Sequence, residues 1–281
     1  MKKSQSTYAE ERDSSGRLLV SNVTSSRPKK IPIMECFGPT IQGEGLMSGT
    51  FSHFLRTGGC PLKCKWCDAM HAVDPKRVKE GRTLMDWREV LDAVQALPWA
   101  PYVTLTGGDP CMWHDLGNII GPLNLSHMRI AVETQGTLFP WWLEQCDVIT
   151  FSPKGPSSGN PVDPQGILEW LKNNGTKRKN RVCVKVVVGT KEDLNYAMSL
   201  YEQVPMNLID AFYFTALTEM AAPTGAGMVS SAIRILNTVD GFQRLANALT
   251  TRAEAGQNFH EKTHVGCQQH VLLWPHTDRG V

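Results

Sequence analysis

Short apolar runs alternate with amphipathic segments along the chain from Ile31 onward. The runs are rich in β-branched and aromatic residues and show little polar alternation, which predicts parallel strands covered on both faces. We expect these strands over residues 52–56, 102–106, 129–133, 147–152, 182–188, 211–217 and 271–274.

The amphipathic segments between these runs predict helices. Thr83 and Asp86 resemble a capping box, and an apolar stripe at helical spacing follows them. Asp163 and Pro164 predict the start of another helix. In all, we expect one helix that ends at Leu97 and three further helices over residues 163–175, 191–203 and 229–249.

Strands that alternate with helices imply right-handed crossovers, and hence a doubly wound sheet or an α/β barrel, complete or partial. Polar or reactive groups follow nearly every expected strand at its C-terminal end, where barrels of this type assemble their active sites. This placement favours the barrel. The groups are Cys60, Thr106 to Asp109, Glu133, Ser152 to Lys154, and Thr215.

The first 30 residues are rich in Ser, Thr, Lys and Glu and contain no apolar run. We expect a flexible tail over 1–30 and a single domain over 31–281, because a signal peptide would need an apolar region. No segment approaches the roughly 20 apolar residues that cross a bilayer. The net charge of +2 recommends neither nucleic acid nor a membrane as a partner.

Three of the eight cysteines lie in one short loop after two glycines: Cys60, Cys64 and Cys67. Eight cysteines in 281 residues do not form a disulfide framework, so metal binding in a reducing compartment, the cytoplasm, explains this crowding better. A complete 4Fe-4S cluster usually takes four cysteines. Three thiolates can therefore hold a cluster in which one iron stays open.

Two other interpretations of the cysteine loop stay open. A structural zinc site would need a fourth ligand, and Cys111, His71 or His114 could supply it, although none completes a standard zinc spacing. The three cysteines could also be unrelated core residues, since buried cysteine is common. That interpretation suits the other five cysteines better than these three.

The C-x3-C-x2-C spacing, with Trp66 before the last cysteine, closely resembles the signature of the radical S-adenosylmethionine superfamily. The resemblance implies a partial (β/α) barrel and a 4Fe-4S cluster whose open iron binds the amino and carboxylate groups of S-adenosylmethionine. In that superfamily, reduction by one electron breaks the sulfonium bond and releases a 5′-deoxyadenosyl radical. The protein's share is positioning and exclusion of water.

The segment Thr-Gly-Gly-Asp-Pro at 106–110 is similar to the superfamily's Gly-Gly-Glu-Pro segment, which receives the methionine end of the cofactor. Asp109 is one methylene shorter than the usual Glu. Because glycine lets a ligand approach the backbone closely, we expect Gly108 to be the contact and Asp109 to be secondary. Taken alone, such a segment is most often only a turn.

A narrower resemblance, to 7-carboxy-7-deazaguanine synthase, spans most of 33–274. This family converts 6-carboxy-5,6,7,8-tetrahydropterin to 7-carboxy-7-deazaguanine, for queuosine and related bases, by radical ring contraction with loss of ammonia. Segment 219–264 fits it poorly. The similar segments are Thr-Ile-Gln-Gly-Glu-Gly at 40–45, Phe-Leu-Arg at 54–56, Glu-Thr-Gln-Gly-Thr at 133–137, Ser-Pro-Lys at 152–154 and Gln-His at 269–270.

This resemblance implies two sets of site residues. The pterin would contact Ile41, Gln42, Gly43, Glu44, Arg56, Thr106 and His270. The residues around S-adenosylmethionine would be Trp66, Cys67, Asp68, Gly108, Ser152, Pro153 and Lys154.

Residue chemistry agrees with these roles but allows structural ones. Gln42 and backbone amides match the donors and acceptors of a pterin edge, and the planar fork of Arg56 suits its carboxylate. Lys154 could meet the carboxylate or ribose hydroxyls of S-adenosylmethionine. Equally, Arg56 could pair with a structural carboxylate, Gln42 could close a turn, and His270 could be an ordinary core or surface histidine.

Magnesium is the point at which this chain departs from the family. After the last cysteine and its Asp the family usually places Thr, whose hydroxyl helps to bind magnesium, whereas this chain has Ala69. A methyl group cannot coordinate a hard cation. Water or a carboxylate such as Asp68 or Asp74 could take the position, or the enzyme could work without the metal. We expect only weak dependence on magnesium.

The resemblance also implies a flavodoxin or ferredoxin as electron donor, and it allows a homodimer. Two other functions stay open. An activase that places a glycyl radical on a partner protein would share the cluster, but it would have no reason to carry Gln42 to Gly45 or Arg56. A non-enzymatic iron-sulfur or zinc protein would not bind S-adenosylmethionine.

Overall fold

The computed structural model describes residues 28–176, 178–218, 228–269 and 272, with the backbone of Glu11–Arg12 and Leu18–Leu19. Those two short segments, β1 and β2, pair antiparallel within the expected tail. The tail and the single domain stay predictions. None of the helices in these ranges is both long and apolar enough to cross a membrane.

One sheet of nine strands organises the described chain, in the order β11-β10-β9-β8-β7-β6-β4-β3-β5. The run from β4 to β11 is parallel, and β3 and β5 add an antiparallel edge. The sheet stays open, so the expected partial (β/α) barrel is confirmed. Its strands are β3 Ile31–Ile41, β4 Phe51–Thr57, β5 Thr83–Met85, β6 Tyr102–Gly107, β7 Arg129–Thr134, β8 Val148–Phe151, β9 Arg181–Val188, β10 Ala211–Ala216 and β11 Thr263–Gly266.

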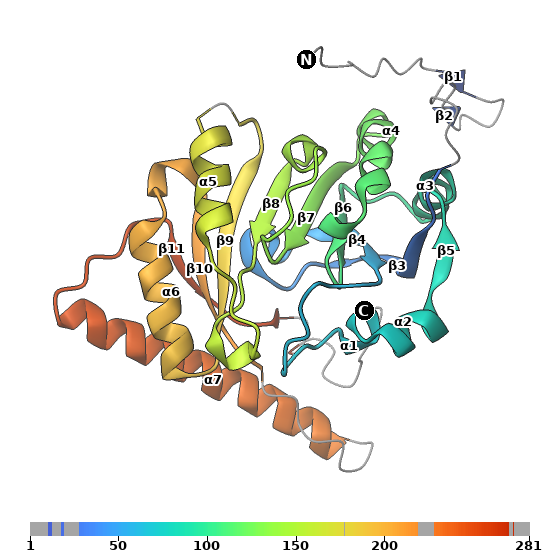
Figure 1. The fold of residues 1–281 in the computed structure, drawn as a ribbon. Coiled ribbons are helices and arrows are strands. Elements are labelled where there is room, and N and C mark those ends of the chain that lie inside the picture. The colour runs from blue at the N-terminus through green and yellow to red at the C-terminus, as the bar shows by residue number, and fades with distance from the viewer. Residues whose placement is uncertain are drawn as a thin grey trace.

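Most of the helices connect successive parallel strands and cover one face of the sheet (Figure 1). The α-helices are α1 Met70–Val73, α2 Pro75–Gly81, α3 Trp87–Gln95, α4 Ile120–Leu125, α5 Gln165–Asn174, α6 Lys191–Gln203 and α7 Met228–Glu254. Short 3-10 turns cover Gly45–Met47, Pro110–Met112, His114–Ile119, Leu143–Gln145, Pro156–Ser158 and Met206–Leu208.

The two faces of the sheet differ in polarity. Alternate strand residues such as Leu105, Val132 and Phe151 join the helices in one apolar core and are at most 1% exposed. Burial of each such side chain stabilises the fold by about 1.5–3 kcal/mol. The residues between them form the opposite, inner face. This face is also covered, as expected, but it is largely polar: Ser52, Thr104, Glu133, Thr150, Lys185 and Tyr213.

Several sequence-based boundaries need correction. The helix expected over 191–203 is confirmed, whereas α7 extends beyond the expected 229–249. Thr83 is not a cap, because it pairs with Ile33 in β5. Of the strand expected over 271–274, only Leu272 is described, and it is helical, since a short apolar run does not distinguish strand from helix.

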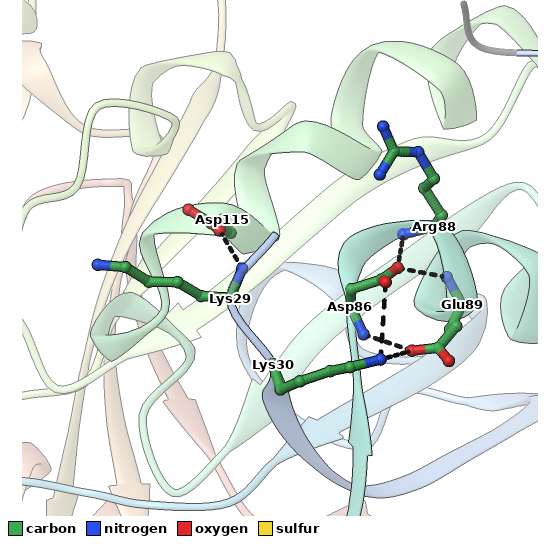
Figure 2. A network of polar contacts seen from close by, with 6 residues as sticks. All are labelled: Lys29, Lys30, Asp86, Arg88, Glu89 and Asp115. Carbon is green, nitrogen blue, oxygen red and sulfur yellow. Dashed lines mark hydrogen bonds and ion pairs between the residues drawn. The ribbon is translucent and has the colours of Figure 1, made fainter. Parts of the chain in front are cut away.

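The capping box of α3 lies three residues later than expected (Figure 2). The carboxylate of Asp86 accepts hydrogen bonds from the backbone amides of Arg88 (3.0 Å) and Glu89 (3.2 Å). The Glu89 side chain in turn accepts from the amide of Asp86 at 2.6 Å. Lys30 Nζ lies 2.6 Å from Glu89 and 3.6 Å from Asp86. The start of β3 is thereby tied to the start of α3.

Replacing Asp86 by Ala should lower the free energy of unfolding by about 1 kcal/mol at pH 7, because the amides at the start of α3 lose their cap. Urea unfolding followed by circular dichroism measures this change. Lys172→Ala, at an exposed position of α5, is the matched control. It should change the free energy by less than about 0.5 kcal/mol.

The effect of Asp86→Ala should also depend on pH. Burial disfavours the charged form of Asp86, but the amides of Glu89 and Arg88 and the charge of Lys30 outweigh it and lower its pKa. Such a carboxylate stabilises the fold above its unfolded pKa of about 3.9, and this contribution disappears as pH falls through the folded pKa. The difference between the two proteins should therefore shrink below about pH 4; a constant difference would contradict this account.

Candidate active site

The cysteine loop follows β4 at the C-terminal edge of the parallel sheet. The backbone turns at Gly59, where φ is +100°, a value that favours glycine. Cys64 is buried at 6% exposure, and Cys60 and Cys67 are half-buried. The amide of Cys67 donates to the carbonyl of Cys64 at 3.3 Å. All eight cysteines are free thiols.

Backbone contacts with the end of β6 hold this loop. The amide of Gly108 donates to the carbonyl of Thr57 at 3.0 Å, and the amide of Asp109 donates to the carbonyl of Gly59 at 2.7 Å. A Cβ on Gly108 would overlap the Gly59 carbonyl and lie 2.9 Å from the carbonyl oxygen of Ala72. Glycine is therefore required here first by chain packing. A contact between Gly108 and a ligand stays a prediction.

The Asp109 carboxylate is fully buried. It accepts hydrogen bonds from the Cys111 amide at 2.9 Å and from Thr134 Oγ1, also at 2.9 Å. Burial raises its pKa, although these hydrogen bonds oppose the rise. Asp109 therefore joins the ends of β6 and β7 and caps the turn that follows.

Burial also keeps the cysteine thiols protonated in the absence of metal. It raises the pKa of Cys60 to about 11 and that of Cys67 to about 12, and it raises the pKa of Cys64 as well. The charge of Lys154 opposes the shift at all three. A cation at this position favours the thiolates that iron binding requires.

Lys154 belongs to the segment that follows β8. Its ammonium donates to Ser152 Oγ at 3.0 Å and lies 5.9 Å from the centre of the Trp66 ring. The Trp66 indole donates to Ser157 Oγ at 2.8 Å. Ser152 and Pro153 are buried. Residues 152–154 and the cysteine loop, expected to bind the same cofactor, thus lie side by side.

The three thiols fit a cluster better than a single zinc ion. In the described part of the chain, no group of three or more His, Cys, Asp or Glu is placed to hold one metal ion. His71 Nε2 lies 3.6 Å from Glu35, His114 accepts from the Trp141 indole, and Cys111 is buried beside Asp109. A cubane presents separate irons to its cysteines, so their sulfurs need not meet at one point.

Segment 41–45, expected to contact the substrate, is a closed loop. The amide of Gln42 donates to the carbonyl of Thr50 at 2.9 Å, and the Gln42 carbonyl accepts from Gly49 at 2.8 Å. The backbone of Gln42 therefore closes a turn, as the structural alternative anticipated. The Gly43 carbonyl accepts from the amide of Gln269 at 3.0 Å. Ile41 ends β3 opposite Phe51.

The Glu44 side chain extends to the inner face of the sheet and meets Lys185. Lys185 Nζ lies 2.6 Å from Glu44 Oε2 and 2.5 Å from Glu133 Oε1. The Lys185 side chain is 3% exposed. Burial alone would lower the pKa of Lys185, but the two carboxylates outweigh it and raise the pKa above its ordinary value. This residue is therefore an ammonium ion.

Gln268 connects this group to the cysteine loop. Its Nε2 lies 3.1 Å from Glu44 Oε1 and 3.1 Å from Asp68 Oδ2. Asp68 directly follows Cys67. The structure thus brings together two sets of predicted residues, one from segment 41–45, the pterin segment, and one from the cysteine loop. The predicted His270 lies outside the described residues.

Arg56 forms an ion pair with a structural carboxylate, Glu35, which was the alternative to a substrate contact. Its Nε donates to Glu35 Oε2 at 2.7 Å across the β3–β4 pair. Burial opposes ionisation of Glu35, but His71 and Arg56 outweigh it and lower the Glu35 pKa. Arg56 pairs in register with Thr106 of β6, so these two predicted residues are neighbours. A substrate contact by the rest of the fork stays a prediction.

Sequence reasoning missed Lys185 and Gln268, whereas the inner-facing Thr215 was among the polar groups expected at the strand ends. A lysine inside the apolar run 182–188 was a usable signal, because a buried charge must be paired. Thr215 is 1% exposed, and its Oγ1 has no hydrogen-bond partner among the described residues. Gln268 carried no local signal, because its importance comes from a contact between distant segments.

Comparison with known proteins is consistent with this geometry. Residues 54–204, more than half of the chain, match the Radical SAM superfamily, and the chain belongs to it. The chain is 36% identical over 178 residues to 7-carboxy-7-deazaguanine synthase from Bacillus cereus, covering 63% of this chain and 73% of that protein. With the Bacillus subtilis enzyme of the same name the identity is 37% over 182 residues, covering 63% and 74%. Within the superfamily, the chain belongs to the 7-carboxy-7-deazaguanine synthase family.

The fold agrees with a solved structure of QueE from Escherichia coli. The TM-score is 0.52 at 24% sequence identity, and the match covers 66% of this chain and 84% of that one. This likeness supports the partial barrel. It carries no information about individual site residues.

Gly108→Ala should displace the cysteine loop, because the new Cβ meets backbone atoms that cannot rotate away. We expect a loss of about 2 kcal/mol in stability, together with less iron retained per chain after reconstitution. Gly49→Ala is the matched control: its Cβ would meet nothing within 4 Å, although φ is +83°. Iron content equal to that of the control would contradict the proposed packing role.

Proposed function

We propose that this protein converts 6-carboxy-5,6,7,8-tetrahydropterin to 7-carboxy-7-deazaguanine by radical ring contraction with loss of ammonia. The supporting observation is the Gln268 bridge between Glu44 and Asp68, which joins the pterin segment to the cysteine loop. Family membership independently supports this reaction. The product serves the synthesis of queuosine and related 7-deazapurines.

In this proposal, Cys60, Cys64 and Cys67 hold three irons of a 4Fe-4S cluster. The cluster and S-adenosylmethionine, when bound, supply the 5′-deoxyadenosyl radical. The protein's residues bind, orient and exclude water. The cofactor would be surrounded by Trp66, Cys67, Asp68, Gly108, Ser152, Pro153 and Lys154, and the pterin by Ile41, Gln42, Gly43, Glu44, Arg56, Thr106 and His270.

The rival functions explain fewer observations. A glycyl-radical activase would need the cluster but not an ammonium held between two carboxylates next to the pterin segment. A non-enzymatic zinc or iron-sulfur protein would need the three thiols but not the Gln268 bridge from the cysteine loop to Glu44. Both would be out of place in this family.

The electron donor is proposed to be a flavodoxin or ferredoxin. Exposed cations lie in the cysteine loop and on α2, whose capping residue Asp74 pairs with Lys63, and they favour an acidic donor: Lys63, Lys65, Lys76, Arg77 and Lys79. Reduction by such a donor should slow as salt rises, whereas reduction by dithionite should not. Free thiols throughout suit the cytoplasm. A homodimer stays a prediction.

Cys64→Ala should abolish the brown cluster absorbance, cleavage of S-adenosylmethionine and product formation, because two thiolates are too few to anchor the cubane. Mass spectrometry after anaerobic reconstitution measures the product. Cys146→Ala, which removes a buried thiol outside the loop, should retain all three properties. A complete cluster and normal turnover in Cys64→Ala would refute the proposed site.

Magnesium should stimulate turnover only weakly. Both oxygens of the Asp74 carboxylate are engaged, Oδ1 by the amides of Lys76 and Arg77 and Oδ2 by Lys63, whereas within the described chain only Oδ2 of the exposed Asp68 accepts, from Gln268. Water or Asp68 is then left to replace the missing hydroxyl. Ala69→Thr should strengthen the magnesium dependence, measured as product formation after chelator treatment. Ala69→Val has the same shape as Ala69→Thr without the hydroxyl, so it should not strengthen the magnesium dependence. An equal response to magnesium in the unmodified protein and both variants would contradict this prediction.

A further inference from the structure

The buried ammonium of Lys185 has none of the binding roles described above, yet it pairs with two carboxylates at the inner face of the sheet. Lys185 lies on β9, Glu133 ends the inner face of β7, and Glu44 belongs to the pterin segment. β8, which leads into Ser152 and Lys154, runs between β7 and β9. One ammonium therefore joins three separate parts of the chain.

The charge balance makes this ammonium indispensable to the arrangement. Two carboxylates held this close repel one another, and burial disfavours both charges. With Lys185 between them, both carboxylates face one ammonium and are held in one arrangement, and their remaining oxygens can accept hydrogen bonds. Without it, the two carboxylates would repel one another and would no longer be held at a fixed separation.

The exposed fractions of the three side chains increase from the core toward the accessible side of the inner face. The Lys185 side chain is 3% exposed, that of Glu44 11% and that of Glu133 27%. The ammonium is thus sealed in, whereas the carboxylates approach the accessible side of the inner face. Lys185 is placed to act through the glutamates rather than by touching a ligand.

Each glutamate lies near residues assigned to both ligands. Glu44, assigned to the pterin, is bridged by Gln268 to Asp68, assigned to the cofactor. Glu133 is the last inner-facing residue of β7, which is flanked by β6, which carries Thr106, and by β8, which leads to Ser152. A shift of either carboxylate would be transmitted to the other through their shared ammonium.

We propose that Lys185 is a positioning residue that fixes Glu44 and Glu133 relative to each other and thereby couples substrate binding to binding of S-adenosylmethionine. This inference rests on the proposed function for the identity of the two ligands. It predicts that each ligand tightens the site for the other, since coupling is reciprocal.

The test measures the dissociation constant of 6-carboxy-5,6,7,8-tetrahydropterin by calorimetry on the reconstituted protein without reductant. The titration is made with and without saturating S-adenosylmethionine. The unmodified protein should bind the pterin about tenfold more tightly with the cofactor present, a typical coupling. In Lys185→Met this ratio should fall to near one.

Two further variants separate positioning from stability. Lys262→Met is the matched control, because the Lys262 ammonium is also anchored, donating to the carbonyls of Met206 (2.9 Å) and Ile209 (2.8 Å) outside the site. It should keep the full coupling ratio even if it unfolds more readily.

Glu133→Gln leaves the Lys185–Glu44 pair intact, so it should fold and bind the pterin while losing the coupling. If Lys185→Met does not fold, the coupling ratio of Glu133→Gln tests the proposal in its place.

A coupling ratio within twofold of the unmodified protein in Lys185→Met, or in Glu133→Gln, would overturn the proposal. Equal pterin affinity with and without cofactor in the unmodified protein would also overturn it. Under turnover, Lys185→Met should form less product for each 5′-deoxyadenosine released. Failure of the proposed function would appear differently, as pterin binding without product in the unmodified protein.

Discussion

The contact between the backbone at Gly107–Gly108 and the backbone at Thr57–Gly59 is the constraint on which the site depends. The ends of β4 and β6 approach so closely that a Cβ on either glycine of the pair would strike main-chain atoms. This contact fixes where the cysteine loop leaves the sheet. Asp109 extends it to β7 through Thr134, so the loop is held by three neighbouring strands.

The alternation of side chains along the parallel strands gives the sheet two different faces. One face supplies the apolar core beneath the helices, and the other presents hydroxyls and charges inward. Buried charges are tolerated only when paired. Lys185, Glu44 and Glu133 meet this requirement, and Arg56 and Glu35 repeat it at the β3 edge. The polar face therefore has a defined geometry before any ligand arrives.

Most of the parallel strands, α5 and α6 could be predicted because their apolar runs and caps are local. The strands Ile31–Ile41, Thr83–Met85 and Thr263–Gly266 escaped prediction, since edge pairing and exposed residues weaken their patterns. Motifs identified the cysteine loop and Gly108, but not why Gly108 must be glycine. The Lys185 group and the Gln268 bridge join residues far apart in sequence, and no local pattern encodes such contacts.

The account requires that the cysteine loop and the polar inner face form one active site. The most direct test supplies substrate deuterated at its ring carbons to the reconstituted, reduced protein with S-adenosylmethionine. Mass spectrometry then measures deuterium in 5′-deoxyadenosine and in the remaining S-adenosylmethionine. We predict that deuterium enters the 5′-deoxyadenosyl group only while 7-carboxy-7-deazaguanine forms, because the radical would form against the bound substrate. Since loss of ammonia leaves the oxidation state unchanged, the hydrogen is returned at the end of each turnover, and the label exchanges into that group. Product formation with no deuterium in either compound would contradict the account.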